Sequence, residues 1–389
     1  MPRFEPFAAL RYREDIDLNE VTAPPYDVID DVERAALEAR TAYNVVRVDL
    51  PVDYGEAARL LDTWEDEGVL VQDDEPAFYV YRMGYHDEAG AARQTTGVIG
   101  ALELAVPGTG DVLPHEHTTP KAKSDRLALL QATRTNLSPI WGLSLAGGLT
   151  ELTEAPGPPV GRATDGEGVH HRLWRVTSPA VLEAVTELVA GAPVVIADGH
   201  HRYETSLAYA SEAGAPTGAD LAMALVVELT ESQLGVRPIH RLLHDLAPGL
   251  DVVEALAPAF EAFETAVDSS LPARMADAGA LGLVLPGPRG WLLRPRPGAF
   301  PADLPDLDSS RLDAARPALG QPRIEYQHGL DIVIGRVAAG RADAAVLLRP
   351  ATVAQIATTA AARDRMPPKT TFFYPKPRTG FVFRRLSPR

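Results

Sequence analysis

The sequence predicts a mixed α/β fold, and three observations lead to this prediction. Short runs of β-branched and aromatic residues alternate along the chain with stretches in which apolar residues recur at helical spacing. The chain has 389 residues, 46% of them hydrophobic and 23% charged, which is enough for more than one hydrophobic core. No apolar run approaches the ~18 to 20 residues that span a bilayer.

The composition excludes several classes of function. A formal net charge of -16 argues against sequence-independent binding of nucleic acid, which needs a basic surface to neutralise phosphates. The chain has no cysteine, so disulfides, thiolate metal ligands and cysteine nucleophiles are excluded. The N-terminus lacks the apolar core of a signal peptide. We therefore expect a cytoplasmic protein that binds small molecules rather than nucleic acid or membrane, with a homo-oligomer left open.

The first predicted lobe, residues 1–110, alternates strands and helices. We expect helices at 31–40 and 54–68, and strands at 7–12, 44–50, 77–85 and 95–104, the last two forming a hairpin. One stretch of this lobe, APPYDVI at Ala23–Ile29, is unusual because two prolines force an extended backbone. Asp27 can cap or bind there, and a rigid turn with a buried Tyr26 is the alternative.

The second predicted lobe, residues 111–248, contains the turn that we expect to bind a ligand. A buried strand at Val194–Ile196 is followed by helical spacing from Tyr203, and Asp198, Gly199, His200, His201 and Arg202 fill the turn between them. Such a turn directs backbone N–H groups and the positive end of a helix dipole into one small space. Two histidines and an arginine make phosphate the expected ligand.

A loop earlier in this lobe also carries titratable groups. It holds His115, Glu116, His117, Lys121 and Lys123, and precedes a helix that Ser124 is expected to cap. Catalytic groups often lie on loops held by rigid elements, although a solvated polar loop is the alternative. Further strands are predicted at 141–145, 171–176 and 222–229, with a helix at 178–190.

The third predicted lobe, residues 249–389, has helices at 250–263, 328–340 and 352–364 and strands at 281–287, 290–296 and 342–350. After the last helix, Lys369, Thr370 and Thr371 offer an ammonium and two hydroxyls, a set suited to phosphate or to Mg²⁺-bound oxygens. A plain edge strand held by prolines is the alternative.

Lysine is rare in this chain. Of 37 basic residues only four are lysines, namely Lys121, Lys123, Lys369 and Lys376. Because an ammonium is a compact, rotatable charge and a guanidinium a flat fork, lysines kept in an arginine-rich chain indicate candidate sites, unless their clustering is chance.

Three motifs resemble those of the free serine kinases of the ParB/sulfiredoxin-like superfamily: PHE at Pro114–Glu116, DGHHR at Asp198–Arg202 and PKTT at Pro368–Thr371. From APPYDVI through ADGHHRYET to MPPKTTFFYPK, the whole chain also resembles the family known as domain of unknown function 1015. The resemblance implies a ParB/sulfiredoxin-like nucleotide-binding core with additional N-terminal and C-terminal α/β lobes. The PHE motif lies about 110 residues into this chain, farther than in the kinases, which leaves the identity of the substrate open.

The resemblance further implies a small-molecule kinase that phosphorylates free L-serine or a similar hydroxy compound with ATP or ADP, giving O-phosphoserine. It assigns Glu116 as the base, the Asp198–Arg202 turn as the phosphate and Mg²⁺ loop, and Lys369–Thr371 as a second phosphate contact. Phosphoryl transfer needs positioning and charge stabilisation, which these residue types supply. We expect Arg202 to grip phosphate bidentately, His200 or His201 to donate, and Asp198 to hold Mg²⁺.

Three residues after the next strand, Arg237, His240 and Arg241, are expected to bind the carboxylate of an amino-acid substrate. Two other functions remain open. One is a zinc-dependent phosphoesterase that uses histidine pairs such as His240 and His244, whose i, i+4 spacing is suggestive on a helix but lacks the Glu of an HExxH pattern. The other is a non-catalytic nucleotide-sensing module, which the acidic charge does not exclude.

Overall fold

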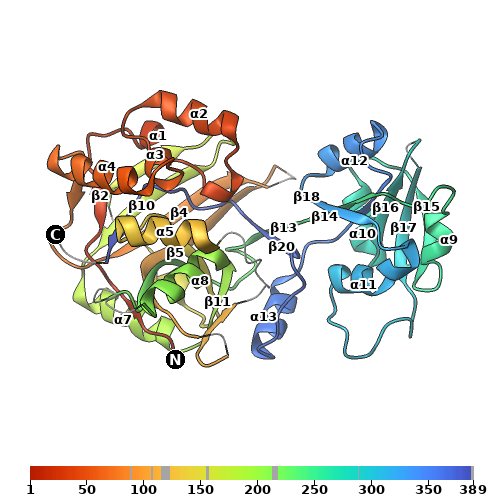
Figure 1. Ribbon diagram of the computed structural model, residues 1–389. Coiled ribbons are helices and arrows are strands. Elements are labelled where there is room, and N and C mark those ends of the chain that lie inside the picture. The colour runs from red at the N-terminus through yellow and green to blue at the C-terminus, as the bar shows by residue number, and fades with distance from the viewer. Residues whose placement is uncertain are drawn as a thin grey trace. The chain divides into compact units, whose positions relative to one another are not determined.

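The computed structural model describes the chain as two compact units (Figure 1). Unit 1 is Met1–Gly235 together with Pro375–Arg389, and unit 2 is Val236–Tyr374. Both contain helices and strands, so the predicted mixed α/β fold is confirmed. The described residues are 1–87, 90–106, 108–114, 123–154, 157–212, 218–287 and 289–386, with the side chains of 123 and 124 left out.

The two units do not follow the predicted lobe boundaries at residues 110 and 248. Strand β5 (Ala92–Glu103), from the first predicted lobe, pairs along its length with β12 (Leu221–Glu228), from the second. Both lobes therefore share one sheet, and the last residues of the chain belong to the same unit. Pairing between strands so far apart in the chain is not encoded in local periodicity.

Unit 1 is built on a nine-stranded sheet. Strand β11 (Val194–Asp198) is parallel to β6 (Val112–Pro114) on one side and antiparallel to β8 (Ile140–Ser144) on the other, and β8 is parallel to β12. The order is β6-β11-β8-β12-β5-β4-β10-β9, with β1 also pairing with β5; the remaining bounds are Phe4–Glu5 for β1, Phe78–His86 for β4, Gly161–Thr164 for β9 and His170–Val176 for β10.

The helices of unit 1 pack around this sheet and around an apolar cluster that contains Tyr12 and Trp64. They are α1 (Leu18–Val21), η1 (Tyr26–Val28), α2 (Asp31–Arg40), α3 (Val46–Asp49), α4 (Tyr54–Asp66), α5 (Lys123–Thr133), α6 (Leu149–Leu152), α7 (Pro179–Ala190) and α8 (His200–Ala210). Two short pairs complete the unit, β2 (Leu10–Tyr12) with β3 (Leu70–Gln72) and β7 (Thr135–Asn136) with β21 (Arg384–Arg385).

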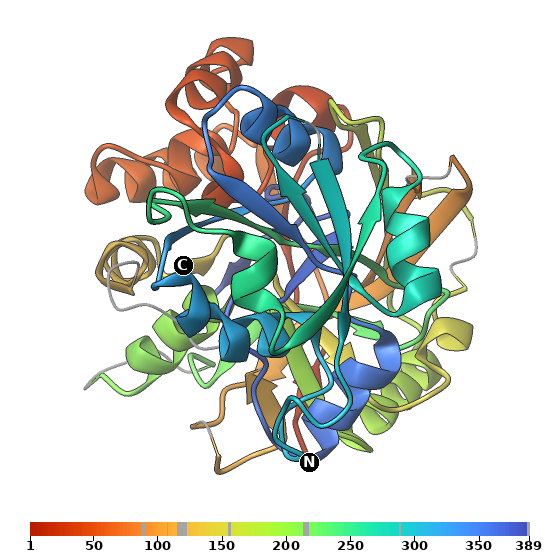
Figure 2. The same ribbon diagram turned by 90° about the vertical axis from the view of Figure 1, so that its right-hand side faces the viewer.

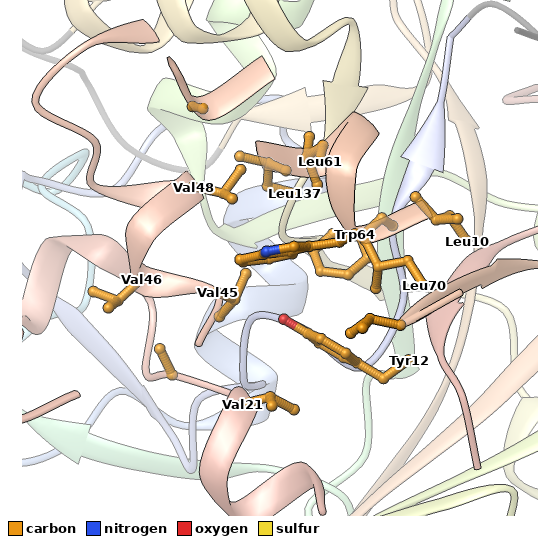
Figure 3. Packing of buried hydrophobic residues seen from close by; sticks show 14 of the residues in the cluster. Leu10, Tyr12, Val21, Val45, Val46, Val48, Leu61, Trp64, Leu70 and Leu137 are labelled. Atoms are coloured by element: carbon orange, nitrogen blue, oxygen red, sulfur yellow. The ribbon is translucent and has the colours of Figure 1, made fainter. Parts of the chain in front are cut away.

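The apolar cluster around Tyr12 and Trp64 holds the N-terminal helices in place. Trp64 and Tyr12 lie near each other in it, with their ring centroids 6.3 Å apart, and Val45, Val46 and Val48 lie to one side of the two rings (Figure 3). Val21 and Ala23 belong to the same cluster. The burial of this apolar surface therefore fixes both α3 and the start of the 23–29 segment. Both stretches contribute residues near the turn at Asp198.

Some of the predicted elements differ from the structure. The strand predicted at 44–50 is helix α3, because the side chain of Asn44 accepts from Val46 N at 3.0 Å and the valines pack into the cluster rather than onto a sheet. The helix predicted at 250–263 stops at Leu256, where Pro258 follows, and Phe260 starts a strand. The strand predicted at 7–12 begins only at Leu10.

Unit 2 is built on a six-stranded sheet in which every neighbouring pair is antiparallel (Figures 1 and 2). Its order is β15 (Phe260–Thr265), β17 (Arg289–Pro295), β16 (Leu281–Leu285), β19 (Ala344–Leu347), β14 (His240–His244) and β18 (Arg323–Gln327). The other elements are β13 (Gly235–Pro238), β20 (Thr371–Tyr374), α9 (Val252–Leu256), α10 (Leu271–Ala278), α11 (Asp308–Ala315), η3 (Arg316–Leu319), α12 (Leu330–Ala338) and α13 (Val353–Ala361).

Candidate functional site

The turn between β11 and α8 has the predicted strand-turn-helix form. The four apolar residues of β11 are buried, and the strand ends at Asp198. Gly199 precedes the helix with φ 86° and ψ 29°, a left-handed conformation that favours glycine. A Cβ at this position would lie 2.9–3.0 Å from atoms of the Arg202 guanidinium, so the turn needs glycine for space as well as for its backbone angles. The helix begins at His200, three residues before the expected Tyr203.

Two cations hold the carboxylate of Asp198. Arg202 Nη2 donates to Asp198 Oδ2 at 2.9 Å, and Lys376 Nζ donates to Asp198 Oδ1 at 2.9 Å. Burial alone would raise the pKa of Asp198, but the charges of Lys376 and Arg202 outweigh it and hold that pKa below its usual value. Asp198 is therefore an ionised carboxylate with both oxygens engaged.

The guanidinium of Arg202 is bonded mainly to the protein itself. Nη1 donates to Ser138 Oγ at 3.2 Å and to the carbonyl of Pro139, while Nη2 donates to Asp198. These bonds occupy both N–H groups of Nη1 and one of Nη2, so Nε and the second N–H of Nη2 are the donors that remain for a bidentate contact with phosphate. Phosphate binding by Arg202 stays a prediction. In this structure the guanidinium ties Asp198 to the residues just before β8.

Lys376 is a residue of this site that the sequence prediction did not assign. Its ammonium also donates to Asp27 Oδ2 at 3.2 Å, so it lies between two carboxylates from distant parts of the chain. The rarity of lysine was one signal for it, and the unusual Ala23–Ile29 stretch was the other. Neither signal alone identifies the pairing.

The segments that carry Asp27 and Lys376 are tied to each other by backbone and side-chain bonds. Ala23 and Thr379 exchange two backbone hydrogen bonds, at 3.1 and 2.9 Å. Arg378 Nε donates to Thr22 Oγ1 at 2.9 Å, and its Nη2 donates to the Thr22 carbonyl at 2.8 Å. This bracing is buried, so it places both charged side chains at the Asp198 turn in a fixed register.

A small cavity of about 60 Å³ lies beside Arg202, between α5, α8 and the strands β7, β8 and β12. The ring of Tyr26 lies under Arg126, whose Cζ is 4.2 Å from the ring centroid. Arg126 Nη1 donates to the carbonyl of Asp49 at 2.7 Å, and burial raises the pKa of the Asp49 carboxyl although Arg126 lowers it. Tyr26 is half-buried rather than buried, and Asp27 beside it accepts a hydrogen bond from Lys376, so the interpretation of this stretch as a turn around a buried Tyr26 is not what the structure has.

The PHE motif begins at the strand next to the turn. Pro114 is the last residue of β6 and is aligned with Ile196 of β11. Because the two strands are parallel, the chain leaves β6 at the same sheet edge as Asp198. The predicted base Glu116, with His115, His117 and Lys121, lies outside the described residues.

The predicted second phosphate contact belongs to unit 2. Thr370 Oγ1 lies 2.9 Å from Ser309 Oγ and donates to the Pro367 carbonyl at 2.7 Å, so this hydroxyl is engaged within the unit. Lys369 is exposed and has φ 59°, and Thr371 begins β20. Contact of these three residues with a phosphate at the Asp198 turn stays a prediction.

The predicted carboxylate-binding residues also belong to unit 2, and two of them are buried. His240 Nδ1 accepts from Leu348 N at 3.2 Å, and burial with the nearby charge of Arg241 lowers the pKa of His240 to about 4. Arg241 lies over the ring of Tyr326 with its Cζ 4.6 Å from the centroid. Arg237 lies over the ring of Tyr374 at 3.4 Å and is half-buried.

Metal binding was predicted at Asp198 and considered for His240 and His244. His240 and His244 stand at opposite ends of strand β14, so the expected helical i, i+4 pair is wrong. Among the described residues there is no group of three or more histidine, aspartate or glutamate side chains arranged to hold a metal ion. Asp198 is a single carboxylate with a cation on each oxygen, which does not fit a resident Mg²⁺. Its role as a metal ligand stays a prediction.

Several solved structures are similar to this chain. A conserved hypothetical protein from Pyrococcus furiosus is 13% identical, with 71% of this chain and 92% of that chain covered and a TM-score of 0.38. A free serine kinase in complex with AMP is 13% identical, with 70% and 88% covered and a TM-score of 0.39. SbnI with a C-terminal truncation, from Staphylococcus aureus, is 13% identical, with 73% and 85% covered and a TM-score of 0.38.

No curated protein matches the chain. In the part of the chain that the structure describes, no helix combines the length and apolar character needed to cross a membrane. The model of the family described as protein of unknown function (DUF1015) matches residues 4–315, and the chain therefore belongs to this family.

Proposed function

We propose that this protein is a small-molecule kinase that transfers a phosphoryl group from ATP or ADP to the hydroxyl of free L-serine or a similar hydroxy compound. The observation that carries the proposal is the turn at Asp198–Arg202. There, helix α8 begins with two histidines and is preceded by a glycine instead of a capping side chain, and the ammonium of Lys376 contacts Asp198 at the end of β11. Backbone N–H groups at such a helix start, with cationic side chains nearby, favour phosphate oxygens.

The proposed chemistry is an in-line transfer. Glu116 accepts the proton of the substrate hydroxyl, the hydroxyl oxygen forms a bond to the terminal phosphorus, and the bond from that phosphorus to the leaving nucleotide oxygen breaks. The parallel pairing of β6 with β11 supports this role, because the chain leaves β6 at Pro114, at the sheet edge where Asp198 lies, and Glu116 follows two residues later in the sequence. His200 or His201 donates to the phosphate, and Arg202 acts indirectly by holding Asp198.

Residues of unit 2 complete the proposal. Lys369, Thr370 and Thr371 are the proposed second phosphate contact. For the carboxylate of an amino-acid acceptor, Arg237 is the best of the three predicted residues, because it is only half-buried, whereas Arg241 is 2% exposed and covered by Tyr326.

Phosphorus NMR of the full chain with ATP or ADP, Mg²⁺ and a panel of hydroxy compounds that includes L-serine tests the proposal. A phosphomonoester product supports the kinase. Tight nucleotide binding without product would favour the sensing module instead, and activity on phosphoesters only with zinc would favour the hydrolase.

The role of the base is tested by Glu116→Gln. It should keep nucleotide affinity and lower turnover by ~10²-fold or more, as expected for loss of a general base. Glu187→Gln is the matched control, because Glu187 is an exposed residue on α7. Turnover that survives Glu116→Gln unchanged would remove Glu116 from the mechanism.

A further inference from the structure

The ammonium of Lys376 bridges two carboxylates that differ in exposure. Asp198 and Lys376 are mostly buried, with side-chain exposures of 21% and 12%, while Asp27 is 42% exposed. The contact of Lys376 with Asp198 is also shorter, 2.9 Å against 3.2 Å to Asp27. An ion pair with an exposed carboxylate contributes little net free energy, so Lys376 loses little by giving up Asp27.

Lys376 is also the cation of this site whose geometry suits exchange of partners. The terminal nitrogens of Arg202 are bonded to Pro139, Ser138 and Asp198 in a fixed planar fork. An ammonium has three donors on a rotatable stem, and it can keep one acceptor while another is replaced. The segment that carries Lys376 is anchored through Arg378 and Thr379, so the proposed exchange needs only rotation of the lysine side chain.

The local charges favour such an exchange only when an anion arrives. The formal charges of Asp27, Asp198, Lys376 and Arg202 sum to zero, since two are negative and two positive. Without ligand, Asp27 balances the ammonium. A phosphate oxygen at the start of α8 would offer the ammonium another anionic acceptor for a charge-assisted hydrogen bond.

We propose that Lys376 is a phosphate-binding residue of the nucleotide site, and that on nucleotide binding its ammonium keeps Asp198 and exchanges Asp27 for a phosphate oxygen. Asp27 acts as the resting counter-ion that competes with the ligand. This inference rests on the proposed function, because it needs a nucleotide phosphate at the Asp198 turn.

The rarity of lysine makes a direct test practical. Lysine labelled with ¹³C at Cε gives signals from only four lysine side chains in the full chain, and Lys376→Met identifies the signal of Lys376. Titration with ADP should shift this signal in the wild-type protein. A signal that stays unchanged at saturating ADP would overturn the proposal.

Calorimetric titration with ADP gives the second readout. Lys376→Met should weaken ADP binding at least ~10-fold, as expected for loss of a charge-assisted hydrogen bond. Asp27→Asn should tighten it by about two- to fivefold, because it removes the competing carboxylate. Arg59→Met is the matched control, since Arg59 is a 74% exposed cation on α4, and it should leave the affinity unchanged.

The outcomes separate this inference from the proposed function. If wild-type protein binds neither ADP nor ATP, the proposed function fails and this inference fails with it. If wild-type protein binds ADP but Asp27→Asn binds it no more tightly, or Lys376→Met binds it as well as Arg59→Met, only the role of Lys376 is overturned. Asp27→Asn and the wild-type NMR titration keep the test decisive should Lys376→Met not fold.

Discussion

Replacement of Arg202 by methionine distinguishes a structural role from a phosphate-binding role. The guanidinium donates to Ser138 Oγ, to the Pro139 carbonyl and to Asp198. Arg202→Met keeps most of the aliphatic volume and removes all three donations. If Arg202 served only to bind phosphate, its replacement would leave the free energy of unfolding unchanged when no nucleotide is added.

The expected loss of unfolding free energy follows from the partners left behind. Removing one member of a mostly buried ion pair costs about 3–5 kcal/mol, and a buried carbonyl without a donor adds to that cost. Because Asp198 keeps Lys376 as a partner, we expect a loss of unfolding free energy at the lower end of this range, about 3 kcal/mol. With a urea m-value of ~3 kcal/mol per molar for a unit of this size, the midpoint should fall by ~1 M.

Tryptophan fluorescence makes the assay specific for unit 1. Three of the four tryptophans, Trp64, Trp141 and Trp174, belong to unit 1, so a Trp291→Phe background reports on that unit alone. Arg59→Met in the same background should change the free energy of unfolding by less than about 0.5 kcal/mol. The positioning role of Arg202 is refuted if Arg202→Met unfolds at the same urea concentration as Arg59→Met and yet loses ADP binding.

Three further predictions concern other parts of the fold. Gly199→Ala should lower the melting temperature more than Gly68→Ala: both place alanine at positive φ, at a cost of about 1 kcal/mol, but a new Cβ lies within 3.0 Å of Arg202 only at the first site, whereas the nearest atom at Gly68 is 3.7 Å away. Equal losses would contradict the close approach. Burial lowers the pKa of His171, so the stability that its neutral form contributes is complete above about pH 6.5 and is lost as the pH falls toward the lowered pKa. The urea midpoint should therefore fall as the pH is lowered from about 7.5 to about 5. His171→Gln should make the midpoint depend less on pH. Thr352→Ala removes a capping box at α13 and should cost unit 2 about 1 kcal/mol in thermal unfolding, with no effect expected if the helix end is held by other contacts.

Local sequence patterns predicted the elements whose residues decide their own conformation. The helix at 31–40 was predicted with the bounds that the structure has, since Asp30 caps it and its apolar residues recur at helical spacing. Strand β12, buried along its whole length, was recognised from its apolar run. The valine-rich stretch 44–50 was mistaken for a strand, because its conformation is decided by packing against Trp64 and by the side chain of Asn44. The packing is a tertiary contact, and the hydrogen bond of Asn44 is not part of a β-propensity scale, so neither could be read from the valines themselves.

The candidate site divides in the same way. The turn at Asp198–Gly199 could be predicted because a buried strand, an Asp-Gly pair and a helix follow one another within a few residues. The contact of Lys376 with Asp198 joins residues 178 positions apart, and that with Asp27 joins residues 349 positions apart, so neither follows from spacing. Even so, the preference of this chain for arginine limited the choice to four lysines. Lys376 lies between two carboxylates, and an arginine at this position would have to contact both of them with one rigid, planar guanidinium. An ammonium can rotate, so it can keep its hydrogen bond to Asp198 while it exchanges Asp27 for a phosphate oxygen.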